Sequence, residues 1–328
     1  MPSLKRILVI SVICVAGVLL TAYTVGYLYK DEVKNVVVQS LNQRLKTKIE
    51  VEHISFSLIR HFPYPSLTFT NVVVFEPNEF ITSGQVLNAR EIVLILSFTS
   101  LFNDNYSLLQ VSITDALLNL QIDENGNANY NIWKSSDKTD ESPNELNIDL
   151  KNVTFTNTDV LYYNIPKNQD ISFLIESGTF KGNFKSEAYA MNASAKLLKS
   201  QVIIDDVKYL NKTDCNVELN LNVNRNTGNY LFETSSIESN GLKLSVEGGL
   251  TINENDTDFD LKISTPEADL PSLIAFIPEK YRGPTIEYNY SGRITFDCFI
   301  KGKSSIHILV SAYLVGSCAY SFNFLKNF

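Results

Sequence analysis

From Ile49 onward, apolar residues recur at every second position in one run of the chain after another. The purest run is Cys215–Asn224, CNVELNLNVN, in which apolar residues alternate with Asn and Glu. Successive side chains of a strand point to opposite faces, so such runs give a sheet one apolar and one polar face. Clusters of Asn, Asp and Gly separate the runs, for example at 123–129 and 224–229. The pattern predicts a mainly β fold over residues 49–303, with antiparallel strands joined by short turns.

Three of these predicted strands supply the candidate functional face. Their apolar members point to one side and polar neighbours such as Asn220, Asn222 and Lys243 to the other. An apolar sheet face can line a groove for lipid chains, or it can form the core of a sandwich; the pattern leaves both open. The candidate residues are Val217, Leu219, Leu221, Val223, Leu242, Leu244, Val246, Phe259, Leu261 and Ile263.

A second constraint is the segment Ile7–Tyr29, which contains no Asp, Glu, Lys, Arg or His. As a helix it would be about 34 Å long, enough to cross a hydrocarbon core of about 30 Å. It exceeds the apolar region of a signal peptide, about 7–15 residues, and no A-x-A site follows it. Residues 1–30 are therefore predicted to be an uncleaved transmembrane anchor, with a cleaved signal peptide as the alternative. Lys and Arg flank it on both sides, so charge leaves its orientation open.

Two further segments have helical features. Residues 31–48 place Val33, Val37, Leu41 and Leu45 four apart, which predicts an amphipathic helix that packs on the sheet or lies in the membrane interface. Residues 269–278 break the two-residue alternation and carry Pro271 where a first helical turn tolerates it, so we expect one short helix there.

Two polar or atypical stretches interrupt this plan. Residues 135–145 are polar and contain Pro143, which indicates an exposed loop or an internal boundary. Residues 304–328 form a hydrophobic tail that does not alternate well. A buried strand, a truncated or out-of-frame end, and a short membrane-touching segment all remain open for it. We expect this tail to contribute little to the fold.

Chemical motifs do not point to an enzyme. The sequence has no GxGxxG, P-loop, GxSxG or HExxH pattern. Its three histidines lack neighbours at ligand spacing, so we expect no metal and no cofactor. The net charge of −8 disfavours nucleic acid as a partner. The four cysteines form no framework; Cys215 and Cys298 are either separate apolar side chains or one bridge.

Two stretches resemble the AsmA-like family. Leu41–Val74 is similar to its N-terminal signature, in which a helix leads to a strand, a phenylalanine-proline turn and a second strand. Ser97–Lys134 resembles a later segment, with Gly126 and Asn129 at the family's Gly and Asn positions and Tyr130 in place of its usual Trp. Weaker likeness continues to Lys303. Family members extend well past this point, so a C-terminally truncated member is one interpretation that the resemblance leaves open.

The resemblance implies a single-pass protein of a bacterial inner membrane, with its C-terminal domain in the periplasm. It also implies a long curled, groove-like antiparallel sheet related to chorein-type bridge-like lipid carriers. The expected function is non-enzymatic: phospholipid transport or outer-membrane lipid homeostasis, with acyl chains as partners. The alternative is an interaction scaffold that assembles outer-membrane proteins without carrying lipid.

Overall fold

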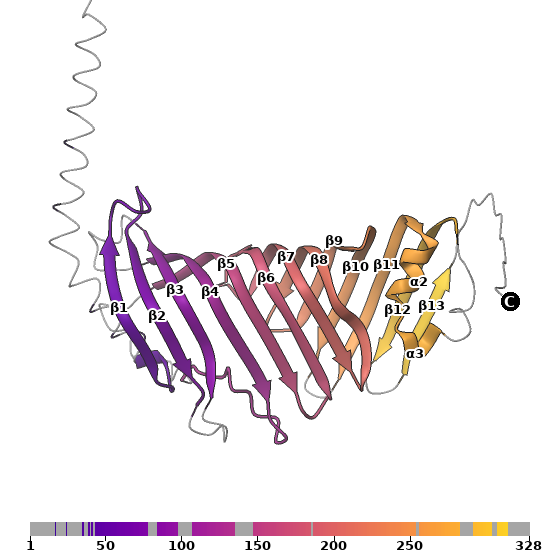
Figure 1. The fold of residues 1–328 in the computed structure, drawn as a ribbon, viewed down its shortest axis with the longest axis horizontal. Helices are drawn as coiled ribbons and strands as arrows, with labels where there is room; N and C mark the ends of the chain where they lie inside the picture. Colours follow the sequence, from indigo (N-terminus) through magenta and orange to yellow (C-terminus); the bar gives the residue numbers. More distant parts are fainter. Residues whose placement is uncertain are drawn as a thin grey trace, which may run out of the picture. The chain divides into compact units, whose positions relative to one another are not determined.

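The strands of the protein form one open antiparallel meander. The computed structural model describes residues 17, 24, 35, 39, 41, 43–77, 84–97, 107–134, 147–184, 186–253, 256–282, 291–303 and 307–313. Thirteen strands follow one another in sequence order, and β1 and β13 are its two edges (Figure 1). Every strand pair whose register is defined is antiparallel, as between β1 and β2. The predicted mainly β class is confirmed.

The strands are long for a globular protein, where about 5–6 residues is usual. Two short helices, α2 (Leu270–Phe276) and α3 (Glu279–Arg282), follow β11. The strands are β1 (Ile49–Ser57), β2 (Ser66–Phe75), β3 (Gln85–Leu96), β4 (Ser107–Ile122), β5 (Asn147–Asn164), β6 (Gln169–Gly182), β7 (Ala188–Ile204), β8 (Val207–Asn224), β9 (Asn229–Ser239), β10 (Leu242–Ile252), β11 (Thr257–Asp269), β12 (Arg293–Lys303) and β13 (His307–Tyr313).

Contacts along the chain define two compact units. Unit 1 consists of residues 1–114 and 130–150, and unit 2 of residues 115–129 and 151–328. The division therefore falls within β4 and within β5. The boundary predicted at 135–145 lies outside the described residues.

Unit 1 has a closed apolar core. Ile54 lies opposite Phe69, and Phe56 opposite Leu67, so β1 and β2 present their apolar residues on one face. That face continues into β3, where Leu94 lies opposite Leu67. Leu67 is fully buried within this cluster. The alternation read from the sequence here produces a dry core.

A short strap covers this core. Leu41 and Ile132 pack against the buried cluster, and Leu45 is itself buried. The backbone N–H of Lys46 donates to the carbonyl of Ile132 at 2.9 Å, and Lys134 N–H donates to the carbonyl of Arg44 at 2.8 Å. Segments 41–46 and 132–134 are thus joined above the sheet.

The strap also explains where the predicted amphipathic helix ends. Its last described helical residue is Arg44, whereas the sequence pattern predicted a helix to Lys48. Thr47 and Lys48 instead bond the end of β2: Thr47 Oγ1 donates to the Phe75 carbonyl at 2.5 Å, and Phe75 N–H donates to the Lys48 carbonyl at 3.0 Å. Tertiary hydrogen bonds outweigh the favourable helix-dipole placement of Lys48.

Unit 2 is a meander of strands that bends at β-bulges. One bulge lies in β9, which has an extra residue between Phe232 and Ser235 where they face Gly248 and Val246 of β10. Gly248 has φ +110°, and a Cβ there would lie 2.1 Å from the carbonyl oxygen of Asp260. Only glycine fits at position 248. The extra residue of β9 bends that strand.

The short helix predicted at 269–278 is present as α2. Asp269 caps it, since its carboxylate accepts from the Ser272 N–H at 3.3 Å. Pro271 lies in the first turn, where the missing N–H costs nothing. The helix packs on β11.

Other expectations lie mostly outside the described residues. Of the predicted anchor, only Gly17 and Thr24 are described, and of the tail only 307–313. No helix among the described residues is both long and apolar enough to cross a membrane. Residues 307–313 form β13, paired with β12 from Asp297 to Lys303. This part of the tail adds a strand to the edge of the sheet; a small contribution of the tail to stability stays a prediction.

Candidate functional site: the apolar face of unit 2

Strand registers place the ten candidate residues on a single face of unit 2. Residues directly opposite in an antiparallel pair share a face. Leu244 of β10 lies opposite Ile237 of β9, which lies opposite Val217 of β8. On the next strand, Val246 lies opposite Ile263. The three predicted rows are therefore one continuous row, which we call the apolar face.

The same registers extend the apolar face to strands that the sequence did not single out. Leu219 lies opposite Ala193 of β7, which lies opposite Phe180 of β6. At the other end, Ile263 lies opposite Cys298 of β12. Phe180 also meets Phe155 of β5 edge to face, with ring centroids 5.6 Å apart. Within unit 2, apolar residues run from β5 to β12.

The apolar residues that β9 adds to this face cannot be recognised from strict alternation in the sequence. These residues are Tyr230, Phe232 and Ile237, whose spacing changes from even to odd. The register shift between Glu218 and Leu221 of β8 against β9 accounts for this, since β9 has an extra residue there. A bulge reverses which positions face which side, so a search for strict alternation misses β9. The register of its neighbours is the signal that identifies it.

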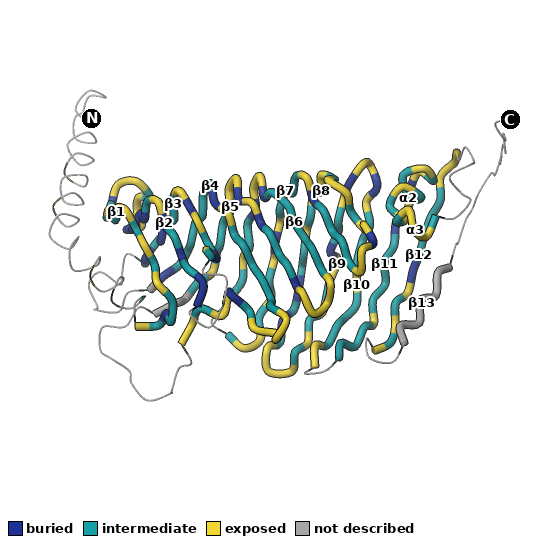
Figure 2. Tube along the Cα trace, turned by 60° about the horizontal axis from the view of Figure 1, so that its bottom comes forward, coloured by how far each residue is buried: buried dark blue, intermediate teal, exposed yellow. Residues whose placement is uncertain are grey.

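Burial differs along the apolar face. Leu221, Val223 and Leu242 are buried. The other seven candidates are half-buried: Val217, Leu219, Leu244, Val246, Phe259, Leu261 and Ile263. Figure 2 shows the same contrast, because β8–β11 are mainly teal and yellow with few dark-blue positions. A face of this kind removes part, but not all, of its apolar surface from water.

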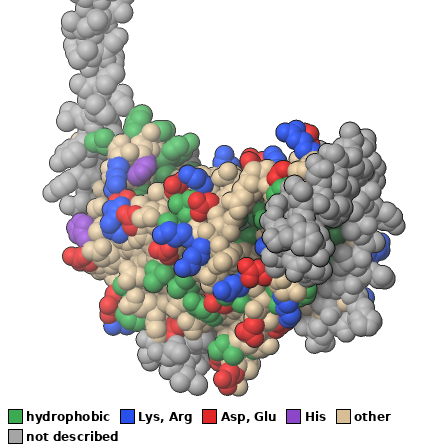
Figure 3. All heavy atoms as spheres, turned by 45° about the vertical axis from the view of Figure 1, so that its right-hand side comes forward, with side chains coloured by type: hydrophobic (Ala, Val, Ile, Leu, Met, Phe, Trp, Pro, Cys, Tyr) green, Lys and Arg blue, Asp and Glu red, His purple; other side chains and the backbone are tan. Residues whose placement is uncertain are grey.

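The opposite face of the same strands is polar and internally bonded. Asn192 Nδ2 donates to Asn220 Oδ1 at 2.7 Å, and Asn220 Nδ2 donates to the Thr234 carbonyl at 2.7 Å. Exposed ion pairs add to it, such as Lys196 with Glu176 at 2.6 Å. Figure 3 shows basic and acidic side chains interspersed over a face of the molecule. We call the side of unit 2 that carries Asn192, Asn220 and Lys196 the polar face.

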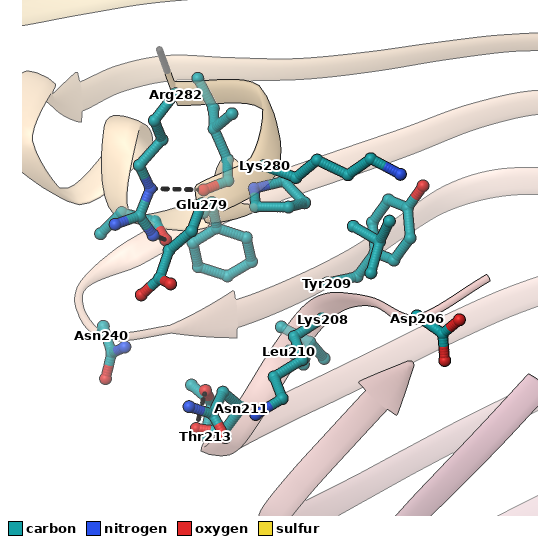
Figure 4. A pocket seen from close by; sticks show the side chains of 15 residues that line it. Asp206, Lys208, Tyr209, Leu210, Asn211, Thr213, Asn240, Glu279, Lys280 and Arg282 are labelled. Atoms are coloured by element: carbon teal, nitrogen blue, oxygen red, sulfur yellow. Dashed lines mark hydrogen bonds between the residues drawn. The ribbon is translucent and has the colours of Figure 1, made fainter. Parts of the chain in front are cut away.

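A cavity of about 560 Å³ lies beside the helix pair. The apolar side chains of Val207, Leu210, Phe276 and Ile277 line part of it. The labelled side chains in Figure 4 come from the β7–β8 turn, the start of β8, the β9–β10 turn and α3. Its charged members are of both signs: Asp206, Lys208, Glu279, Lys280 and Arg282. This mixture gives the cavity no strong preference for an anion or a cation.

Arg282 lines this cavity and holds the two short helices together. Its Nε donates to the Ile277 carbonyl at 2.6 Å, and its Nη2 donates to the Ala275 carbonyl at 2.7 Å (Figure 4). These carbonyls belong to the end of α2, where a cation is favourable. The guanidinium therefore fixes α3 against α2. Nearby, the hydrogen bond between the hydroxyl groups of Tyr209 and Tyr281 favours the protonated form of Tyr209 and raises its pKa.

Metal-ligating side chains do not gather at one place among the described residues. The described part of the chain contains no group of three His, Cys, Asp or Glu side chains that could hold a metal ion. Cys215 and Cys298 are both free and buried, so the alternative of a bridge between them is not realised. Burial raises the pKa of the Cys298 thiol, which keeps it protonated and unreactive at neutral pH.

The Gly and Asn of the family-like segment have clear structural roles. Gly126 has φ +83° in the turn after β4. Asn129 is fully buried: its Oδ1 accepts from Gln121 N–H at 2.8 Å, and its Nδ2 donates to the Asn119 carbonyl at 3.0 Å. This side chain folds the returning chain back onto β4. Tyr130, at the aromatic position, is exposed.

Comparison of the chain with models of known protein families, with curated proteins and with solved structures found no match.

Proposed function

We propose that the apolar face of unit 2 carries the acyl chains of membrane lipids, and that the protein is a non-enzymatic lipid carrier of the AsmA-like type. The observation that carries this proposal is the continuous apolar row from β5 to β12, most of whose candidate residues are only half-buried. A sheet curled about this row would form a groove open to lipid.

The energetics favour such a role. Each CH₂ group exposed to water costs about 0.8 kcal/mol, so a 16-carbon chain faces about 13 kcal/mol in an aqueous gap. Contact with an apolar protein face removes much of this cost and needs no catalytic group. The sequence of Ile7–Tyr29 supports attachment to the membrane from which lipid would enter. On this proposal the chain is anchored in a bacterial inner membrane and its sheet lies in the periplasm.

A photoreactive, clickable fatty acid incorporated into the lipids of cells that express the full chain tests this proposal. After irradiation, lipid-modified peptides are mapped by mass spectrometry. We expect modified peptides from β8 and from β10–β11, in addition to any from the anchor. Lipid adducts confined to Ile7–Tyr29, or protein adducts in place of lipid, would contradict the proposal; the latter would favour an assembly scaffold.

Matched variants make this test specific. Leu219→Asp and Leu244→Asp place a charge on the apolar face and should abolish lipid adducts on the sheet. Leu231→Asp makes the same substitution on the polar face, since Leu231 lies opposite Asn222 and Gly249. Its side chain is 50% exposed, and its adducts should match those of the unmodified protein. Asn220 is a poorer control, because Asp there loses the donor to Thr234.

A further inference from the structure

The turn between β1 and β2 exposes an unusual group of large apolar side chains. Ile59 is 49% exposed, Phe62 57% and Tyr64 45%, all within the sequence LIRHFPYP at residues 58–65. Large apolar residues gathered at one exposed site mark an interaction surface more often than chance exposure does. We call these three residues the apolar tip.

The turn is held rigidly, so the tip cannot simply fold back on the sheet. Ser57 Oγ accepts from the N–H groups of Ile59 and Arg60, at 3.2 and 3.1 Å. Phe62 N–H donates to the Ile59 carbonyl at 3.2 Å, and Tyr64 N–H donates to the His61 carbonyl at 2.9 Å. Below the tip, Leu58 is buried in the core of unit 1. The base of the turn is thus packed while its three apolar side chains point outward.

An ion pair and hydrogen bonds hold the two ends of the turn. Arg60 Nη2 lies 3.1 Å from a carboxylate oxygen of Glu91 on β3. His61 Nδ1 lies 3.1 Å from Ser66 Oγ, which in turn donates to the Ser57 carbonyl at 3.3 Å. The N–H of Leu96 donates to the Pro65 carbonyl at 2.9 Å. The turn is therefore tied to β1, β2 and β3.

We infer that the apolar tip inserts into the interface of the lipid bilayer and fixes how unit 1 meets the membrane. Aromatic rings with one polar end, such as Tyr64, prefer the boundary between headgroups and acyl chains, and Phe and Ile prefer the acyl side. Residues 58–65 contain no acid, so no negative charge opposes an anionic surface. The uncharged segment Ile7–Tyr29 precedes the tip in the same chain. A bilayer is the partner whose chemistry fits both.

Tryptophan fluorescence in reconstituted vesicles tests this inference with the full chain. The chain has one tryptophan, Trp133, so Trp133→Phe gives a silent background. Phe62→Trp then reports on the tip. Ile165→Trp is the matched control, because Ile165 is 56% exposed in the β5–β6 turn of unit 2. Vesicles contain phosphatidylcholine and phosphatidylglycerol, with or without bromine on the acyl chains.

Bromine on the acyl chains should quench most of the emission of Phe62→Trp and leave Ile165→Trp unchanged. Aqueous iodide should give the reverse order. Equal quenching of the two variants, or none in either, would overturn the inference. A blue-shifted but unquenched Phe62→Trp would indicate a protein surface, such as a second copy of the chain, and would overturn it as well.

A further variant tests whether the three side chains insert together. Ile59→Ser with Tyr64→Ser, added to Phe62→Trp, should lose most of the bromine quenching. The melting temperature should stay unchanged, since both side chains are exposed. Unchanged quenching in this variant would overturn the role of the tip. The quenching experiment reads the position of the tip, whereas the carrier proposal is read from lipid adducts on β8. A tip that does not insert can therefore be distinguished from a sheet that carries no lipid.

Discussion

Units 1 and 2 are both built from strands with alternating apolar residues, yet these residues are buried to different extents in the two units. In unit 1, Leu67 and Leu96 are fully buried in a contiguous cluster, and the strap through Leu45 covers it. In unit 2, Leu219 and Leu244 are half-buried on a row that spans eight neighbouring strands, β5 to β12. Alternation specifies which residues share a face, whereas a covering segment decides whether that face becomes a dry core.

The difference gives the two units different tolerances. A covered core loses both the transfer free energy and the packing of any side chain removed from it. A half-buried face loses less, because water can reach the altered side chain. Substitutions in the core of unit 1 should therefore cost more stability than substitutions on the apolar face of unit 2.

The largest effect is expected from a charge in the covered core. Leu67→Asp places an unpaired carboxylate at a fully buried site, and we expect a loss above about 4 kcal/mol, enough to unfold unit 1. Leu219→Asp should cost below about 2 kcal/mol, because its charge can reach water. Urea unfolding followed by circular dichroism measures both. Equal losses at the two sites would mean that both faces are closed cores.

A smaller effect is expected at the bulge of unit 2. Gly248→Ala forces a Cβ against the Asp260 carbonyl at a positive φ, and it should cost about 2 kcal/mol. Gly249→Ala is the control, since its nearest neighbour lies at 3.7 Å and its φ is ordinary. Thermal melting compares the two. A Gly248→Ala protein as stable as Gly249→Ala would show that β10 and β11 can separate locally to accept the Cβ.

Asn129 provides a test at the end of β4. Asn129→Ala leaves Gln121 N–H and the Asn119 carbonyl without these partners and should cost about 2 kcal/mol. Asn127→Ala, at an exposed position of the same turn, should cost clearly less. The comparison uses urea midpoints at neutral pH. Similar costs would mean that the turn, and not the buried amide, holds this segment.

The smallest effect is a pH dependence at Asp123. Hydrogen bonds from Asn127 and Asn125 lower the pKa of its carboxyl group below the usual value. Its folded pKa is thus below its unfolded pKa, so its stabilisation is present above the unfolded pKa and is lost as pH falls through the folded one. Asp123→Asn should melt slightly below the unmodified protein at neutral pH, and the difference should shrink below about pH 4. A constant difference would exclude this ionisation as the cause.

Much of the strand pattern could be predicted from the sequence, because side-chain alternation directly reflects backbone geometry. The ten candidate residues share one face as their spacing implied, and α2 begins beside Pro271 as expected. The apolar residues that β9 adds to this face could not be predicted, since its bulge reverses the alternation after Ser235. The strap over unit 1 was also missed in part. Its hydrogen bonds join Arg44 to Lys134, which local patterns cannot relate.

The most direct test of the central claim is site-specific photo-crosslinking from the two faces of the sheet. A photoreactive amino acid is placed at position 219 on the apolar face or at position 231 on the polar face of the full chain, in cells with radiolabelled phospholipid. We expect a strong lipid adduct from position 219 and little or none from position 231. Equal adducts from both positions, or none from position 219 in a folded protein, would contradict this claim.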